Sequence, residues 1–492
     1  MTILSPVSNT ATPTERGSGA TLAVLVGAYL MIGVDSTVIN VALPKIQHEL
    51  HFSPTGLSWV LNSYTLAFGG LLLLGSRIGD RLGRRRTFTA GVLLFTLASL
   101  LGGLAPDNGW LLAARALQGV GAALATPNVL ALIATNFAEG PQRNRALSIY
   151  SATAGIGASV GLVLGGLLTS FVSWRWALLI NVPVGTAVAL AAPRLITQPP
   201  RHSGHFDAAG ALTGTLGTTA LVYGFIRVAG HSWGDGQALA GFGAALLLLA
   251  GFLLIERRAA QPVVPLRLLA DRNRAGAYLN LLLIPAGMLP AFFFLTLFVQ
   301  NALGYSPLRA GFAFLPLTLS MFTAVRLAPR ALARFGPRPV LVAGAVLLTV
   351  AGLWLTQLRA DGGFLTSLLG PMLVLGLGAG FSFMPMSALV LTGVGAAESG
   401  AAAGLLQTLQ WTGGTVGLAV LVTVYGTAGR HGSGDPVHHL VRGLDAAFTG
   451  ATAITVLALL VTVLVLRTPP RDPAAPQPSA GARRPVDSAA GR

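Results

Sequence analysis

An isolated aspartate lies within the first long apolar run of the sequence. Asp35 is the only acidic residue deep inside any run long enough to cross a membrane. A charged side chain at the centre of a bilayer costs about 2.5–3.5 kcal/mol, and burial disfavours the ionised form of an acid. Such a group could take up a proton on one side of a membrane and release it on the other. The alternative interpretation is a structural acid that is paired with an arginine.

Arg115 is the natural candidate for such a partner, because it too lies inside an apolar run, in the segment RALQG that ends at Gly119. An arginine within a membrane span must face a partner or water. Arg115 also lies within a turn or two of the expected start of its helix, so its side chain could extend to the outer surface instead. The two interpretations place the guanidinium group beside Asp35 or at the membrane surface.

The segment from Gly75 to Arg86, GSRIGDRLGRRR, places five arginines around Asp80. Gly79 and Gly83 would permit a tight turn and a close approach of the backbone. An ordinary cytoplasmic loop explains the arginines, because such loops are enriched in basic residues. It does not explain an aspartate flanked by glycines at fixed spacing, so the segment is a candidate functional element.

Glycines recur at every fourth residue in a later run, followed by one more: Gly157, Gly161, Gly165 and Gly166. On a helix the first three share one face, and small residues at this spacing let two helices approach closely. The stripe predicts either a static packing seam or a seam on which two halves of the molecule rock. Gly413 and Gly417 form a similar pair late in the chain.

Polar and aromatic residues inside the apolar runs are candidates for lining a substrate cavity. They are Asn40, Asn62, Tyr64, Gln118, Asn128, Gln300, Gln407, Gln410 and Trp411. An apolar wall for a greasy ligand could come from Phe292, Phe293, Phe294, Phe298, Phe381 and Phe383. For each residue taken singly, helix packing is the simpler explanation. The sequence has no cysteine, no histidine spacing typical of zinc and no Walker loop, so we expect no metal, no cofactor and no ATP-driven pumping.

These residues lie in a chain with the composition of a polytopic membrane protein. Of its 492 residues, 53% are apolar and only 10% are charged, against about 25% charged residues in an ordinary soluble domain. A soluble protein of this size could not cover its surface with so few charges, which excludes a soluble enzyme and a disordered chain. The net charge of +16 does not indicate nucleic acid, because the basic residues lie in short groups between apolar runs.

The apolar runs are long enough for fourteen membrane-spanning helices of roughly 20 residues each. They cover about 20–42, 56–75, 87–105, 110–135, 146–171, 175–195, 208–229, 237–256, 275–301, 308–329, 338–358, 365–392, 401–426 and 445–466. The runs are too uniformly apolar for barrel strands, so we expect an all-α membrane protein. With both termini in the cytoplasm, most arginines fall in the cytoplasmic segments, which favours this orientation in the cytoplasmic (inner) membrane.

A weak internal repeat relates the segment 76–86 to the segment 328–338. Aligning Gly83 with Gly336 also matches Arg81 with Arg334 and Arg85 with Arg338. Such a parallel repeat suggests two six-helix bundles. We therefore expect a cytoplasmic tail over 1–19, an N-terminal bundle over 20–196, a two-helix insert over 207–256, a C-terminal bundle over 275–466 and a disordered cytoplasmic tail over 467–492.

Four segments, in this order, resemble the major facilitator superfamily: VDSTVINVALP (34–44), GDRLGRRR (79–86), RALQG (115–119) and WRWALLINVPVG (174–185). The closest subgroup is the fourteen-helix drug:proton antiporters of the EmrB/QacA type. The resemblance implies export of small amphipathic drugs or antibiotics through the membrane by alternating access, driven by protons. It assigns proton coupling to Asp35 and to Arg115 with Gln118 and Gly119. It further implies a cytoplasmic gate (Asp80, Arg81, Gly83 and Arg84) and an antiporter motif (Gly157, Gly161, Gly165 and Gly166).

Three positions depart from the family pattern. Ser76 replaces the first glycine of the gate motif, and Leu162 replaces a proline of the antiporter motif. Ala333 occupies the position that the internal repeat aligns with Asp80. The single deep acid favours neutral or monocationic apolar substrates. The alternatives are a narrow exporter of one metabolite, sugar or amino acid, a proton-translocating subunit of a respiratory enzyme, and a membrane sensor or scaffold that transports nothing.

Overall fold

The computed structural model describes residues 15–199, 208–259, 271–359, 363–392, 399–429 and 436–467. Within these ranges the regular structure is helical. Fourteen helical segments are long and apolar enough to cross a membrane, which confirms the predicted number of spans. Helices suit these runs because a spanning segment must satisfy its own backbone N–H and C=O groups in lipid.

The first six spans are α1 (Glu15–Glu49), α2 (Trp59–Leu82), α3 (Arg84–Gly103), α4 (Asn108–Asn136), α5 (Pro141–Phe171) and the pair α6 (Trp176–Leu179) and α7 (Asn181–Leu195), with a short helix η1 (Gly56–Ser58) before α2. The next two are α8 (Ala208–Gly230) and α9 (Gly236–Arg258). The last six begin with α10 (Arg272–Met288), α11 (Pro290–Leu297) and η3 (Phe298–Ala302), which form one span. They continue with α12 (Pro307–Ala313), α13 (Leu315–Phe335), α14 (Pro337–Leu355), α15 (Phe364–Ser367), α16 (Leu369–Leu391), α17 (Ser399–Gly429) and α18 (Pro436–Leu464).

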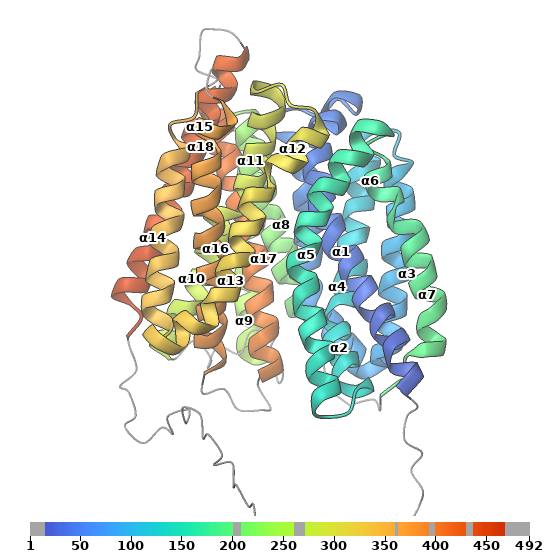
Figure 1. Ribbon diagram of the computed structural model, residues 1–492. Helices are drawn as coiled ribbons and strands as arrows, with labels where there is room; N and C mark the ends of the chain where they lie inside the picture. Colours follow the sequence, from blue (N-terminus) through green and yellow to red (C-terminus); the bar gives the residue numbers. More distant parts are fainter. Residues whose placement is uncertain are drawn as a thin grey trace, which may run out of the picture.

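The helices form two groups that lie side by side (Figure 1). One group contains α1–α7 and the other contains α10–α18, while α8 packs against both α2 and α17 and α9 packs against α8. The beginning of α1 and the end of α18 lie on the same face, which we call the terminal face; the opposite one is the distal face. The division into domains at the stated boundaries stays a prediction, and most of the two expected tails lies outside the described residues.

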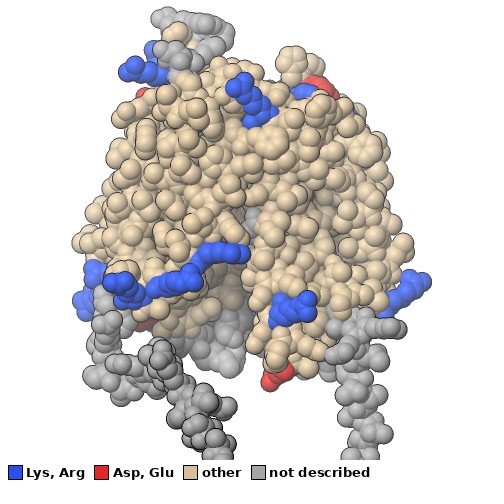
Figure 2. Space-filling view, in the orientation of Figure 1, with Lys and Arg blue, Asp and Glu red and all other residues tan. Residues whose placement is uncertain are grey.

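The surface between the two faces carries few charged side chains. Figure 2 shows a broad belt without Lys, Arg, Asp or Glu, and the charged residues in this view lie towards its two edges. Large apolar side chains such as Phe171, Leu246 and Leu247 are exposed on the helices. Such a belt is expected where lipid tails, rather than water, contact the protein.

The two segments that the internal repeat aligns were expected to be loops, but the helices extend through most of both. The segments 76–86 and 328–338 are almost entirely helical, because α2 and α3 are separated only by Gly83, and α13 and α14 only by Gly336. These glycines have φ angles of +107° and +80°, a region that glycine enters without the steric penalty of a Cβ atom. The two residues are those that the internal repeat aligns. The first span is also longer than predicted, because α1 continues through Pro44 to Glu49.

Glycines allow α2 to lie unusually close to α4. A Cβ atom at Gly75 would overlap with the carbonyl oxygen of Ala123, and a Cβ atom at Gly119 would overlap with that of Tyr64. The backbones of the two helices therefore touch where these glycines face the partner helix. This close packing fixes α4, which carries Arg115, against the helix that follows α1.

Gly75→Ala should therefore lower the thermal unfolding temperature of the purified protein. Overpacking costs about 1–3 kcal/mol, which exceeds the roughly 1 kcal/mol that alanine gains over glycine in a helix. Gly243→Ala on α9 is the matched control, because nothing lies within 4 Å of a Cβ atom there. Equal unfolding temperatures for the two variants would contradict the close contact at Gly75.

Candidate functional site

Asp35 is fully buried on α1, and three side chains bind its carboxylate. Arg115 Nη1 lies 2.7 Å from Oδ2, and Asn181 Nδ2 lies 2.7 Å from Oδ1. Gln118 Nε2 also donates to Oδ1, at 3.2 Å. The Asp35 carboxyl group is therefore paired with Arg115 and accepts hydrogen bonds from three side chains in this conformation.

Arg115 is 1% exposed, so the structure places its side chain beside Asp35 and not at the membrane surface. Its Nε donates to the carbonyl oxygen of Val60 at 3.1 Å, and its Nη1 also donates to Gln118 Oε1 at 2.9 Å. The guanidinium carbon lies 4.5 Å from the centre of the Tyr64 ring. The cation thus contacts α1, α2 and its own helix α4.

Two members of this network were missed in the sequence analysis. Ser99 on α3 accepts from Gln118 Nε2 at 2.7 Å and from Asn181 Nδ2 at 3.4 Å. Asn181, the first residue of α7, belongs to the segment WRWALLINVPVG, where it is the one amide side chain in an apolar stretch. The buried network therefore joins α1, α3, α4 and α7, and all of these helices belong to the first group.

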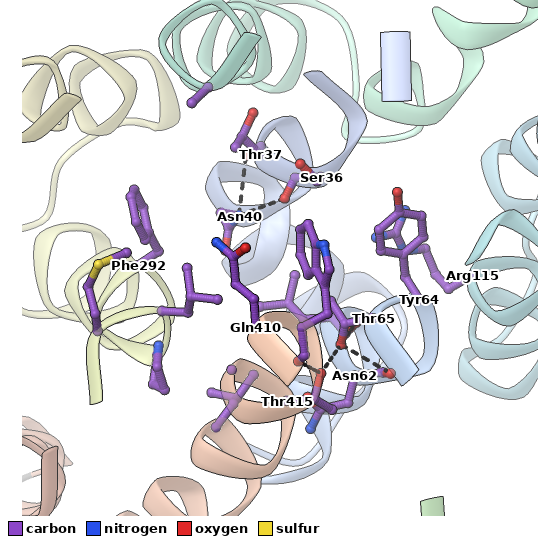
Figure 3. Close-up of a pocket in the computed structure, with 18 of the residues that line it drawn as sticks. Ser36, Thr37, Asn40, Asn62, Tyr64, Thr65, Arg115, Phe292, Gln410 and Thr415 are labelled. Carbon is purple, nitrogen blue, oxygen red and sulfur yellow. Dashed lines mark hydrogen bonds between the residues drawn. The ribbon is translucent and has the colours of Figure 1, made fainter. Parts of the chain in front are cut away.

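A cavity of about 230 Å³ lies between the two groups of helices. Five of the predicted cavity residues line it: Asn40, Asn62, Tyr64, Gln410 and Trp411. Figure 3 shows how Asn40, Asn62 and Gln410 surround this space. Of the six phenylalanines predicted for an apolar wall, Phe292 and Phe383 line the cavity. Arg115 lines the cavity too, whereas Asp35 is not among the lining residues, so Arg115 contacts both the cavity and the buried carboxylate.

The other predicted cavity residues do not line this cavity. Gln118 belongs to the Asp35 network, and Gln300 on η3 donates to the carbonyl oxygen of Val41 at 2.9 Å, across the seam between the groups. Asn128 donates to the carbonyl oxygens of Leu124 and Gly75. Their amide groups thus bond to their own or to neighbouring helices. Five further residues are also absent from the lining: Gln407, which is half-buried on α17, Phe381, and the core residues Phe293, Phe294 and Phe298.

The arginine-rich segment is held against its own half. Asp80 Oδ1 accepts from Arg84 Nε at 3.0 Å and lies 2.8 Å from Arg84 Nη2, so the pair bridges the break between α2 and α3. The backbone N–H of Arg85 donates to Gln198 Oε1, beyond the end of α7. Arg81 lies exposed in the last turn of α2. In this conformation the Asp80 carboxylate thus bonds within the first group of helices.

The predicted glycine stripe faces α1. Cβ atoms at Gly161 and Gly165 would lie 2.8 Å and 2.6 Å from the carbonyl oxygens of Val34 and Val38, and Gly157 also faces this helix. The stripe thus forms a packing seam inside the first group. Gly413 and Gly417 of α17 approach the backbone of α10 in the same way, inside the second group.

Only Gly166 of the motif faces the other group in the described part of the chain. A Cβ atom there would lie 2.7 Å from the carbonyl oxygen of Pro307 on α12. One turn earlier, the carbonyl oxygen of Leu162 would lie 2.5 Å from a Cβ atom at Gly311 of α12. The two groups therefore meet at backbone distance along α5 and α12, near the distal face (Figure 1).

Comparison with known proteins places these features in a family. The model of the Major Facilitator Superfamily matches residues 25–418. The chain is 40% identical over 468 residues to the cephamycin export protein CmcT of Amycolatopsis lactamdurans. The aligned region covers 93% of this chain and 96% of that protein. It is 42% identical over 455 residues to the puromycin resistance protein of Streptomyces alboniger, with 90% of each chain covered.

Solved structures show the same arrangement of helices at much lower sequence identity. The transporter PepTSo of the POT family superposes with a TM-score of 0.66 over 93% of this chain and 100% of that one, at 14% identity. The similarity at this identity concerns the fold alone.

Proposed function

The chain belongs to the Major Facilitator Superfamily, a family of transporters rather than enzymes, and we propose that it is a proton-coupled exporter of amphipathic drugs or antibiotics. One observation carries the proposal. The buried Asp35 carboxylate is paired with Arg115, and Arg115 also lines the cavity between the two groups of helices. A proton site and a substrate site that share one residue can influence each other directly.

Protonation of Asp35 would remove the counter-ion of a fully buried arginine. Breaking a buried ion pair from one side costs about 3–5 kcal/mol, because the remaining charge is left without compensation. About 5.5 kcal/mol moves a two-state equilibrium from 1:99 to 99:1. Uptake of one proton at Asp35 is therefore strong enough to shift the balance between two conformations substantially.

The coupling must also run in the opposite direction. If the proton weakens substrate binding beside Arg115, then bound substrate weakens proton binding at Asp35 by the same factor. Substrate and proton would thus occupy the transporter alternately, which is the requirement for antiport. The membrane potential adds about 2.3 kcal/mol per charge and per 100 mV to an inward proton.

Alternating access requires that the seam between the groups opens and closes at each face in turn. In the described conformation the seam is closed near the distal face, where Gln300 bonds to Val41 and the N–H of Leu308 donates to Ser170 Oγ at 3.0 Å. We propose that the terminal face is cytoplasmic, as the arginine distribution indicates. The described state would then be closed towards the outside.

The substrate class follows from the relatives and from the cavity. The two relatives are named for cephamycin export and for puromycin resistance, and we propose antibiotics of comparable amphipathic character for this chain. The cavity contains both aromatic surface and amide groups, which suits such molecules. Growth tests against a panel of antibiotics, with and without the protein, would check this. Protection against a single compound would favour a narrow-specificity exporter instead.

Asp80→Asn should strongly reduce export without unfolding the protein. The Asp80 carboxylate bridges α2 and α3 through Arg84, at the point where the proposed gate must change shape. Glu139→Gln is the matched control, because Glu139 also pairs with an arginine four residues later, Arg143, at 3.1 Å. Export is to be measured in inverted vesicles with a pH gradient. If both variants lost export equally, the effect would be one of surface charge and the gate role would be refuted.

A further inference from the structure

The cavity between the two groups offers polar groups but no free charge. Among the described residues that line it, Arg115 is the only charged one. Its guanidinium group is already engaged by Asp35, by Gln118, by the carbonyl oxygen of Val60 and by the ring of Tyr64. The counter-charge, Asp35, lies behind Arg115 and outside the lining. A ligand in the cavity therefore faces Arg115, whose positive charge is already neutralised by Asp35.

Asn62 in the cavity wall is a fully buried residue with unused hydrogen-bonding capacity. Asn62 on α2 is fully buried, and neither its Nδ2 nor its Oδ1 has a hydrogen-bond partner among the described residues. Burial without a partner is unfavourable, since the amide loses its hydrogen bonds to water and gains none in the protein. An amide can both donate and accept, so a carbonyl, amide or hydroxyl group of a ligand could bond to it. Because both amide atoms are covered in this conformation, such a bond requires a small turn of the Asn62 side chain towards the cavity.

Other asparagines of the spans show that this situation is particular to Asn62. Asn40 also lines the cavity, but its Nδ2 donates to the carbonyl oxygens of Ser36 and Thr37 (Figure 3). Asn280 on α10 is fully buried outside the cavity, and it bonds to Gly276 and to Thr462. Asparagines with a structural role are thus satisfied by their neighbours, whereas Asn62 is not.

The surroundings of Asn62 fit an apolar ligand with few polar groups. Met288, Phe292, Met321 and Trp411 supply apolar lining from the second group of helices. The hydroxyl groups of Thr65 and Thr415 bond to each other at 2.8 Å, so they are less available to a ligand. The Asn62 amide is thus a buried, unpartnered polar group at the edge of a mostly apolar space, and the amide of Gln410 is a second polar group in the same lining.

We propose that Asn62 determines specificity by hydrogen bonding to an uncharged polar group of a neutral, otherwise apolar substrate, and that permanent cations are poor ligands. This inference rests on the proposed function, because it takes the cavity as the substrate site. A permanent cation would leave water without meeting a free counter-charge, and it would approach the cation Arg115. Exchange of a neutral molecule for a proton then moves net charge, so transport responds to membrane potential.

The test is binding to the purified protein, measured by equilibrium dialysis with radiolabelled probes. Chloramphenicol is neutral and carries an amide and hydroxyl groups, whereas tetraphenylphosphonium is a permanent apolar cation. We expect the unmodified protein to bind chloramphenicol at least about tenfold more tightly. Asn62→Leu should weaken chloramphenicol binding by about tenfold, equivalent to about 1.4 kcal/mol, and leave tetraphenylphosphonium unaffected. Asn62→Gln, which keeps both polar atoms, should restore part of the affinity.

Thermal unfolding distinguishes recognition from a structural role. Asn62→Leu should not lower the unfolding temperature, because it removes a buried amide that has no partner. Asn280→Leu is the matched control: it breaks existing bonds, so it should lower the unfolding temperature but leave the chloramphenicol Kd unchanged. The proposal is overturned by equal affinity for both probes, by an unchanged chloramphenicol Kd in Asn62→Leu, or by absence of chloramphenicol binding. Binding without export driven by a pH gradient would instead refute the proton-coupled function and leave the specificity of the cavity intact.

Discussion

Asp35→Asn should reduce export driven by a pH gradient to the level of vesicles without the protein. Asparagine is nearly the same size as aspartate, but it cannot take up and release a proton, so the gradient can no longer drive the cycle. The change also leaves Arg115 buried without its counter-ion, 2.7 Å from the lost carboxylate oxygen. Loss of a partner in such a pair destabilises a protein by about 3–5 kcal/mol. Uptake into inverted vesicles measures the first effect, and thermal unfolding the second.

A double variant separates these two effects. Asp35→Asn combined with Arg115→Met removes both charges, and replacing a buried ion pair by neutral residues is often neutral for stability. The double variant should therefore unfold at a higher temperature than Asp35→Asn alone, yet remain unable to use a pH gradient. Recovery of gradient-driven export in the double variant would show that the proton binds elsewhere and that the pair is structural.

Gly311→Ala should shift the transporter away from the described conformation. The added Cβ atom would lie 2.5 Å from the carbonyl oxygen of Leu162, a backbone contact that α5 and α12 can relieve only by separating. Overpacking of about 1–3 kcal/mol corresponds to a roughly 5- to 150-fold change in a conformational equilibrium. Because export needs both conformations, its rate should fall even if the protein remains folded.

The shift can be measured by cross-linking across the seam. Ser170 Oγ lies 3.0 Å from the backbone nitrogen of Leu308, so cysteines at these two positions should cross-link when the distal face is closed. The chain contains no cysteine of its own, which removes any background. Cross-linking should fall in Gly311→Ala and stay unchanged in Gly243→Ala, whose added methyl group meets nothing. Undiminished cross-linking in Gly311→Ala would contradict the close contact of α5 and α12.

The spans could be predicted from the sequence because lipid limits what a chain can do. A run of about 20 apolar residues has few alternatives to a helix, and all fourteen runs are helical. The pairing of Asp35 with Arg115 follows from the same constraint, since isolated charges inside a bilayer must find a partner. The exact helix ends were harder to predict, because α2 continues through three charged residues until Gly83 allows the chain to turn.

Other parts of the site depend on which face of a helix points where, and the sequence pattern leaves this open. Glycines at every fourth residue suit a seam within one group as well as a seam between two groups; those of α5 face α1. Small uncharged residues such as Ser99 and Asn181 are too common in spans to be singled out without their neighbours. The missing partner of Asn62 is a property of its surroundings, and the residue type alone does not reveal it.

Release of protons on substrate binding tests the coupling at Asp35 most directly. The purified protein is mixed, in weakly buffered solution, with an antibiotic from the growth panel that it is known to bind. A pH-sensitive dye records the resulting change in pH. At a pH where Asp35 is partly protonated, the account predicts that the unmodified protein releases protons, at most one for each antibiotic molecule bound. It also predicts that Asp35→Asn binds the antibiotic without releasing protons. Binding to the unmodified protein without proton release at every pH at which it stays folded, or equal release by Asp35→Asn, would contradict the account.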